Sequence, residues 1–435
     1  MQRVSKAKPR LIVTFLAALS LVCYVLRMNI SVASKFLLVE FGLTQIQIGQ
    51  VFSSFMLGYA LFQLPAGILG DRWGPRRVLT LAAIWWGTTT VLTAIIPGLL
   101  ANTALGALGG LIAIRFLLGV GEAATYPVAT RAIASWIPPS GRGLANAIVI
   151  AGATLGAAST PPLVSWLMVS YGWRMSFYVT GLAAFLLAII WWLFSSDAPA
   201  LRDVEASHPG IEASKFTSGE RNGGGVVASP GPWGQILRNK NIWLLSISYM
   251  FDSYLLFIFI FWLYTYLTDV RGFSLLRGGL FTSLPFVCGT IMTPIGGHLC
   301  DRLCLRFGAP RGRRIEPVVC LLLGGLFVFL GAKVSNPYIA IAVLSLSAGF
   351  IQATEGAYWS TSNDMGRNFA GAAGGMMNMF GNLGGVVSTA LVPILVKHFG
   401  WLVALGSGTV TAIIAALLWF TVRAHRDPEA RTACG

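Results

Sequence analysis

Five ionisable residues lie in stretches of the sequence that are otherwise apolar: Arg27, Arg115, Glu122, Asp252 and Glu355. Inside a bilayer each charge costs about 3 kcal/mol on insertion scales, so such side chains are expected to face a partner or a polar pathway. Glu355 lies nearer the end of its apolar stretch than the others. Charges placed in this way predict binding of a charged molecule, transfer of a proton, or both.

Arg27 is the candidate anchor for an anion. Its guanidinium is permanently charged, and its planar donors match a carboxylate, phosphate or sulfonate. At about 1.5 Å per residue it lies about 22 Å into its helix, near the middle of a membrane. It belongs to a polar stripe with steps of three and four residues, formed by Ser20, Tyr24, Arg27, Ser31 and Ser34. The alternative is a permanent salt bridge to Glu122 or Asp252.

Glu122 differs from Arg27 because it can lose its charge. Burial favours the neutral acid and a nearby guanidinium favours the carboxylate, so a glutamate whose Arg partner moves can bind and release a proton. Arg115 lies seven residues earlier, about two helical turns away on one face, which is too far for tight pairing unless its side chain reaches along the helix. We expect a proton switch, and the alternative is a static packing pair.

Further polar residues complete the expected site. The glycine-rich stretch near position 380 carries two asparagines one turn apart, although its glycines are best explained by close helix packing. The expected substrate-binding residues are Arg27, Tyr24, Tyr59, Asp252, Asn378, Asn382 and Tyr358. The expected proton-coupling residues are Glu122, Arg115, Asp252 and Glu355. Tyr358 is also explained by the aromatic belt at a membrane surface.

The elements that position these residues are membrane helices. The chain is 55% hydrophobic and 11% charged, with a mean hydropathy of +0.71, which indicates a membrane protein. Twelve apolar spans are expected near 12–38, 47–70, 78–97, 107–128, 143–168, 174–195, 242–268, 278–300, 317–333, 337–362, 371–396 and 400–422. The predicted fold is all-α, with an N-terminal six-helix half (1–195), a Gly-, Ser- and Pro-rich cytoplasmic linker (196–241) and a C-terminal six-helix half (242–435).

The net charge of +15 follows the membrane topology. With both termini in the cytoplasm, 23 of the 31 Lys and Arg residues fall on the cytoplasmic side and six on the other, as the positive-inside rule requires. This excludes a nucleic-acid partner, and a bacterial plasma membrane is expected. The cysteines predict neither disulfides nor a metal site, although Cys300 and Cys304 lie close to His298. No cofactor is expected.

An internal repeat is visible in two similar loops. Asp71-Arg72 and Asp301-Arg302 lie 230 residues apart, each followed by a glycine turn and clustered Arg. The first loop, "GILGDRWGPRRV", has the pattern Gly-x-x-x-Asp-Arg-x-Gly-x-Arg-Arg and resembles the signature of the major facilitator superfamily. The resemblance implies a cytoplasmic gate formed by Asp71, Arg72, Arg76, Asp301 and Arg302. A purely topological anchor is the alternative for the arginines.

Three motifs resemble the anion:cation symporter family within that superfamily. They are "YVLRMNISVA", "RFLLGVGEAATYP" and "ATEGAYWST". The resemblance implies that Arg27 contacts a substrate carboxylate, that Glu122 takes part in proton coupling, and that Arg115 is its partner. The chain departs from the family at Leu26, where sugar-acid symporters carry an Asp. Asp252 stands where some relatives have a second substrate Arg.

The expected function is therefore proton-coupled import of a small organic monoanion, such as a sugar acid or an aromatic acid, by alternating access. The protein is expected to be a monomer and not an enzyme. An exporter or a sodium-coupled carrier is the first alternative. A membrane receptor or an intramembrane enzyme is a remote one.

Overall fold

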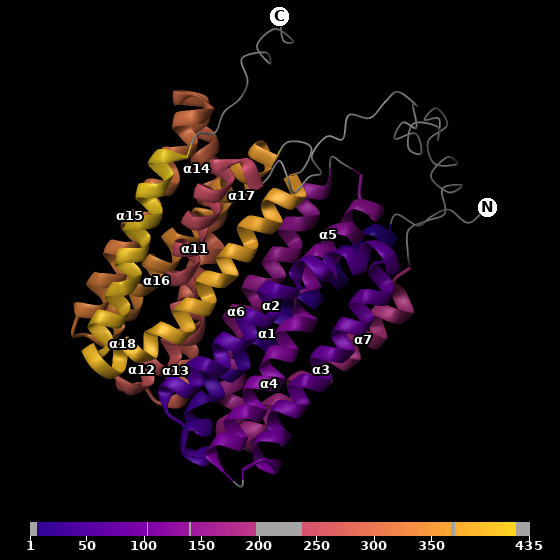
Figure 1. Ribbon diagram of the computed structural model, residues 1–435, viewed down its shortest axis with the longest axis vertical. Coiled ribbons are helices and arrows are strands. Elements are labelled where there is room, and N and C mark those ends of the chain that lie inside the picture. Colours follow the sequence, from indigo (N-terminus) through magenta and orange to yellow (C-terminus); the bar gives the residue numbers. More distant parts are fainter. Residues whose placement is uncertain (1–6, 102, 139–140, 197–236, 367–369, 423–435) are drawn as a thin grey trace, which may run out of the picture.

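Two helical bundles stand side by side in the computed structural model, which describes residues 7–101, 103–138, 141–196, 237–366 and 370–422. The N-terminal bundle consists of α1 (Ala7–Phe41), α2 (Gln45–Trp73), α3 (Pro75–Leu99), α4 (Ala104–Glu122), α5 (Thr125–Trp136), α6 (Arg142–Tyr171) and α7 (Trp173–Phe194). In Figure 1 it runs from indigo to magenta, and the orange and yellow C-terminal bundle lies beside it. Most of the expected linker lies outside the described residues.

The C-terminal bundle follows the same plan. It consists of α11 (Lys240–Phe261), α12 (Leu263–Asp269), α13 (Leu275–Thr282), α14 (Leu284–Phe307), α15 (Ala309–Lys333), α16 (Pro337–Ala353), α17 (Glu355–Gly366) and α18 (Ala370–Thr421). All regular structure in the described ranges is helical. The all-α class of the prediction is thus confirmed.

The number of membrane spans is close to the prediction. Ten helical segments of the described chain are long and apolar enough to cross a membrane, and α2 is not among them. One of the ten, within α18, joins two helices across Gly400, whose φ of 79° and ψ of 173° are not helical. Counting α2 and dividing α18 at Gly400 gives the expected twelve, which stays a prediction.

The turns repeat between the two bundles. Gly74 (φ 82°) joins α2 to α3, and Gly308 (φ 83°) joins α14 to α15. Gly172 (φ 85°) joins α6 to α7 at a place that corresponds to Gly400. Such positive φ values favour glycine because it has no Cβ, and their recurrence supports duplication of one unit.

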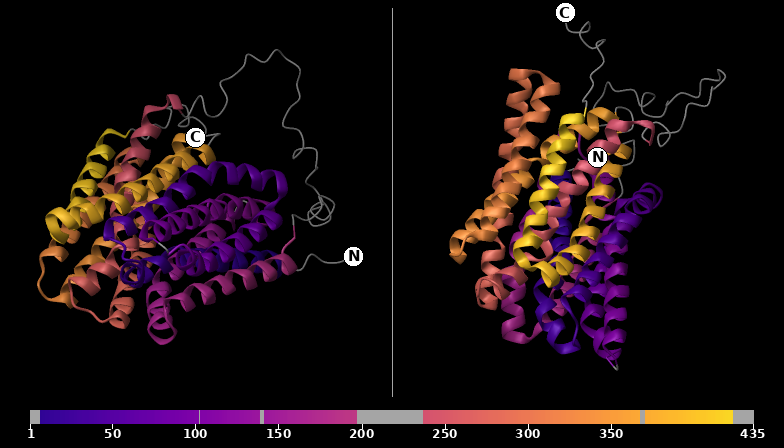
Figure 2. Two further views of the ribbon diagram at one scale, coloured as in Figure 1. Left: turned by 60° about the horizontal axis from the view of Figure 1, so that its bottom comes forward. Right: turned by 60° about the vertical axis from the view of Figure 1, so that its left-hand side comes forward.

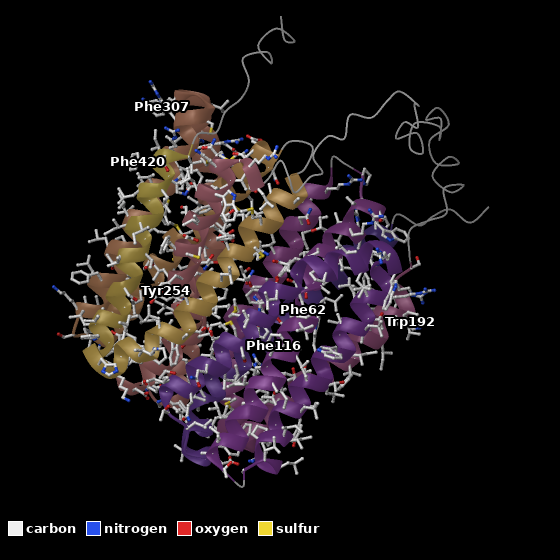
Figure 3. All side chains as sticks on the ribbon, in the orientation of Figure 1. Phe62, Phe116, Trp192, Tyr254, Phe307 and Phe420 are labelled. Carbon is white, nitrogen blue, oxygen red and sulfur yellow. The ribbon has the colours of Figure 1, made fainter. Side chains whose placement is uncertain are left out.

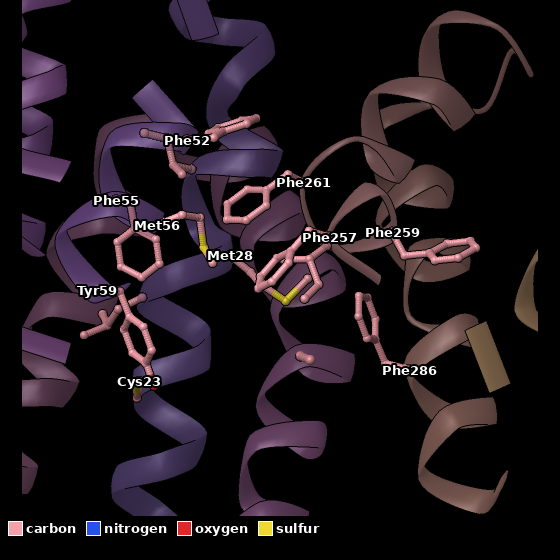
Figure 4. Close-up of a cluster of buried hydrophobic side chains, with 14 of the residues drawn as sticks. Cys23, Met28, Phe52, Phe55, Met56, Tyr59, Phe257, Phe259, Phe261 and Phe286 are labelled. Carbon is pink, nitrogen blue, oxygen red and sulfur yellow. The ribbon is translucent and has the colours of Figure 1, made fainter. Parts of the chain in front are cut away.

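The bundles contact each other mainly through α2 and α18. Ser53 Oγ donates to the Val386 carbonyl over 2.9 Å, and the Phe52 and Phe261 rings stack with centroids 4.9 Å apart (Figure 4). At the end of α1, Lys35 pairs with Asp269 of the other bundle. Lys35 lies near the end of α1 that is farthest from the N-terminus. Figure 2 shows the close packing of the two bundles.

Candidate functional site

Arg27 and Glu122 form a buried ion pair between α1 and α4. Arg27 Nε donates to Glu122 Oε2 over 3.1 Å, and Nη2 lies 3.1 Å from the same oxygen. Arg27 is 3% exposed and Glu122 is fully buried. Within the described chain, Oε1 of Glu122 has no hydrogen-bond partner. From the sequence, a salt bridge to Glu122 or Asp252 is the alternative for Arg27. This structure contains the salt bridge to Glu122.

Aromatic rings surround the Arg27 guanidinium. Its carbon lies 4.6 Å from the centroid of Tyr59, 4.7 Å from Tyr24 and 5.2 Å from Phe55. Ring faces attract a cation, so these rings stabilise the guanidinium beside its ion pair with Glu122. In Figure 4 Tyr59, Phe55 and Cys23 lie together at one side of the buried cluster. Tyr24 and Tyr59 thus both lie beside Arg27, and their role in substrate binding stays a prediction.

Arg115 holds the backbone of α1 rather than Glu122. Its Nη2 donates to the Arg27 carbonyl over 3.0 Å and its Nη1 to the Leu26 carbonyl over 3.4 Å. The side chain is fully buried, and its guanidinium carbon lies 5.2 Å from the Phe55 ring. Arg115 therefore fixes α1 against α4 at the level of the Arg27–Glu122 pair.

Cys23 is a site residue that the sequence reasoning missed. Its thiol donates to Glu122 Oε2 over 3.2 Å and lies 3.7 Å from Thr125 Oγ1. Cys23 comes four residues before Arg27, one helical turn along α1, and this spacing is the signal that could have found it.

The C-terminal bundle carries two carboxyls in different settings. Asp252 of α11 is fully buried; it accepts one long hydrogen bond from Thr354 at 3.5 Å, and its Oδ2 has no partner in the described chain. Glu355 accepts from Tyr249 at 3.0 and 3.1 Å and from Trp359 at 2.9 Å. Tyr249 and Trp359 were not predicted. The Glu355 carboxylate thus accepts three hydrogen bonds, whereas Asp252 accepts one long one.

The remaining expected substrate residues lie near Glu355 in the chain or on α18. Tyr358 is fully buried and shares a 2.7 Å hydrogen bond with Ser248; its ring packs against Trp419, so it lies within the C-terminal bundle. Asn382 donates to the Asn378 carbonyl over 2.7 Å. Asn378 is half-buried and Asn382 is 6% exposed.

The expected gate residues lie at helix ends within each bundle. Arg76 donates to the Trp192 carbonyl at the end of α7 over 2.7 Å, and Arg314 donates to the Val422 carbonyl after α18 over 2.6 Å. Figure 3 marks Trp192 at the outer edge of the N-terminal bundle. Exposed residues at the ends of α2 and α14 are Arg72, Asp301 and Arg302. The Asp71 side chain lies outside the described part of the chain.

Both glutamates lie where a helix is interrupted. Glu122 is the last residue of α4, and Thr125 at the start of α5 donates to its carbonyl over 2.7 Å. Glu355 is the first residue of α17, directly after Thr354 ends α16. The residues between the two helices keep right-handed helical φ and ψ in both places, so each glutamate lies at a local irregularity of one continuous span.

Comparison with known proteins identifies the family of this chain. The model of the Major Facilitator Superfamily matches residues 13–389. The chain is 34% identical to a protein named probable sulfoacetate transporter SauU from Cupriavidus necator, over 87% of this chain and 85% of that protein. It is 27% identical to a hexuronate transporter of Bacillus subtilis, over 89% of this chain and 88% of that one.

Two solved structures share the fold. One is a bacterial homologue of the human lysosomal transporter Spinster, inward-facing and unoccupied, with a TM-score of 0.77 at 18% identity over 96% of this chain and 97% of that one. The other is a D-xylose-proton symporter, with a TM-score of 0.73 at 14% identity over 95% and 98% of the two chains. The chain is a multi-pass membrane transporter, not an enzyme, and it belongs to the Major Facilitator Superfamily.

Proposed function

We propose that the protein imports a small organic monoanion together with a proton across a bacterial plasma membrane, by alternating access between its two bundles. The observation that carries this proposal is the Arg27–Glu122 pair: the candidate anion anchor is held by a carboxyl group that can be neutralised. The carboxylates are expected to be those of sugar acids or aromatic acids. Relatives named for sulfoacetate, hexuronate and galactarate/D-glucarate support the wider class of organic anions.

The balance of buried charge supports coupling to a proton. In the described chain the buried charged side chains are Arg27, Arg115, Glu122, Asp252 and Glu316, so acids exceed guanidiniums before any anion arrives. Adding a monoanion to a fully ionised interior would leave uncompensated negative charge in a medium of low dielectric, which is costly. A proton on Glu122 or on Asp252 removes the excess.

Competition for Arg27 gives the coupling its mechanism. A proton on Glu122 removes the negative charge that holds the guanidinium, and the substrate carboxylate then takes that place. Because linkage is reciprocal, a bound carboxylate on Arg27 also makes protonation of Glu122 easier. Substrate and proton therefore load together, and substrate affinity is expected to rise as the pH falls. Asp252 is a second candidate proton site because of its burial and its unpaired oxygen.

The test uses purified protein in liposomes. A thermal-stability screen with sugar acids, aromatic acids, dicarboxylates, amino acids and neutral sugars first identifies a ligand, since binding stabilises the folded state. Glu122→Gln is then expected to retain substrate exchange and lose accumulation driven by a pH gradient. Glu316→Gln, which removes another buried carboxyl, is the control and is expected to keep both.

Two results would refute the proposal. Equal loss of exchange and accumulation in Glu122→Gln would remove the coupling role of Glu122. Accumulation that depends on sodium at constant pH would show that the coupled ion is sodium and not a proton.

A further inference from the structure

Glu355 is a carboxyl group on the C-terminal side of the candidate site. Proton coupling through Glu122 does not require it. Every group that contacts its carboxylate in the described chain is a donor: the Tyr249 hydroxyl reaches both oxygens, and the Trp359 indole reaches Oε2. These contacts stabilise an ionised carboxylate.

Glu355 lies close enough to the Arg27 side of the site to act on the same ligand. Tyr24, whose ring covers Arg27, belongs to α1, and Tyr249, which donates to Glu355, belongs to α11; these two helices contact each other across the two bundles. Tyr24 and Glu355 are both half-buried, whereas Arg27 and Glu122 are buried. A small molecule with its carboxylate on Arg27 would therefore direct its other end toward Glu355.

Nothing in the neighbouring sequence offsets this negative charge. The stretches 241–270, 337–366 and 370–396, which include α16, α17, the first part of α18 and all of α11 after Lys240, contain no Lys, Arg or His. The helices α14 and α15 also pack against α17 and carry basic residues, of which Arg313 pairs with Asp364 near the end of α17. A second anionic group on the ligand would meet Glu355 and the Tyr249 hydroxyl that donates to it, with no cation in these stretches to pair with. A hydroxyl or ammonium group would instead donate to the Glu355 carboxylate.

We propose that Glu355 determines substrate specificity: the transporter accepts monoanions with a hydrogen-bond donor at the end opposite the carboxylate, and it rejects dianions. This inference rests on the proposed function, because it takes the substrate carboxylate to bind at Arg27. It narrows the substrates from organic anions in general to hydroxylated or amino-bearing monocarboxylates.

The test compares ligands that differ only at the far end. D-gluconate and D-glucarate form one pair, and 4-hydroxybutyrate and succinate form a shorter one. Binding to the purified full-length protein is measured by calorimetry at one pH. The monoanion of whichever pair fits the site is expected to bind at least tenfold more tightly than its dianion. The amine 6-amino-6-deoxy-D-gluconate separates an ammonium preference from a hydroxyl preference.

Variants of Glu355 test whether this residue causes the selectivity. Glu355→Gln is expected to bring the monoanion-to-dianion ratio close to one, mainly through tighter binding of the dianion, whereas Glu355→Asp retains the charge and most of the ratio. Glu316→Gln removes a buried carboxyl of the same bundle and is expected to leave the ratio unchanged. The ratio of the unaltered protein is a test that does not depend on the folding of any variant.

The outcomes separate this inference from the proposed function. Equal affinity for both members of a pair in the unaltered protein, or an unchanged ratio in Glu355→Gln, overturns the role of Glu355 and leaves carboxylate binding at Arg27 in place. If no member of either pair binds, the inference that hydroxylated monocarboxylates are the substrates fails, whereas the proposed function is tested separately by the wider ligand screen. If the ligands bind equally well to Arg27→Ala, the anchor itself is wrong.

Discussion

At the scale of single residues, the contacts of Glu122 are divided unequally between its two oxygens. Arg27 and the Cys23 thiol both donate to Oε2, whereas Oε1 has no hydrogen-bond partner in the described chain. A proton arriving at Glu122 therefore meets no competing donor at Oε1. Cys23 in turn stabilises the charged form, because a thiol donates to a carboxylate but gains little from the neutral acid.

Replacing Cys23 tests this assignment. In Cys23→Ala the carboxylate loses a donor, so Glu122 takes up a proton more readily, and the pH at which substrate affinity falls by half is expected to move upward. A thiol is a weak donor, so the shift is expected to be about half a unit to one unit. Binding measured from pH 5 to 9 gives the profile. Cys23→Ser keeps a donor at this position and serves as the control; identical profiles for alanine and serine would contradict the role.

At the scale of the helices, the contact between α2 and α4 sets the surroundings of Arg27. A Cβ added at Gly119 would lie 2.1 Å from the Phe55 carbonyl oxygen and 2.9 Å from the Tyr59 nitrogen, so only glycine allows this approach. One turn away, Phe62 and Phe116 meet edge to face (Figure 3). The rings of Phe55 and Tyr59 reach Arg27 because the two backbones approach closely.

Gly119→Ala is therefore expected to destabilise the protein and weaken substrate binding. Overpacking of this kind costs about 1–3 kcal/mol, which a thermal melt of the purified protein detects. Gly109 of the same helix has no atom within 4 Å of an added Cβ, so Gly109→Ala is the matched control and gains only helix propensity. A normal melting temperature in Gly119→Ala would show that α2 and α4 separate without cost.

The sequence predicts much of this site because charged residues, which cost free energy inside a membrane, are easily recognised among apolar neighbours. Arg27 and Glu122 could be selected in this way, as could Tyr24 through its helical spacing. The contacts of Arg115 could not be predicted, because a long side chain chooses between Glu122 on its own helix and carbonyls of α1 only once the helices are packed. Tyr249 and Trp359 escaped notice because aromatic residues are common in membrane helices and carry no charge.

At the scale of the whole molecule, the two bundles meet along α2 and α18, where α6 packs against α13 and α14, and at the end of α1. Ser53 reaches the Val386 carbonyl there, and a Cβ added at Gly49 would lie 2.5 Å from the Thr389 carbonyl oxygen. Lys35 and Asp269 form an ion pair between the bundles, whereas Arg174 and Glu40 form a similar pair within the N-terminal bundle. The expected topology places this face outside the cytoplasm.

If the bundles separate at this face during transport, breaking the Lys35–Asp269 pair shifts the population toward the state open to the outside. Such a partly exposed pair contributes about 0.2–1 kcal/mol, so Asp269→Asn is expected to increase labelling of a cysteine placed at Ser53 by up to about fivefold with a membrane-impermeant thiol reagent. Glu40→Gln, which breaks the pair inside one bundle, is expected to leave labelling unchanged. A Lys35→Asp, Asp269→Lys double variant is expected to restore the original rate. Equal labelling in all variants would mean that this face does not open, and with it the alternating-access proposal would fail.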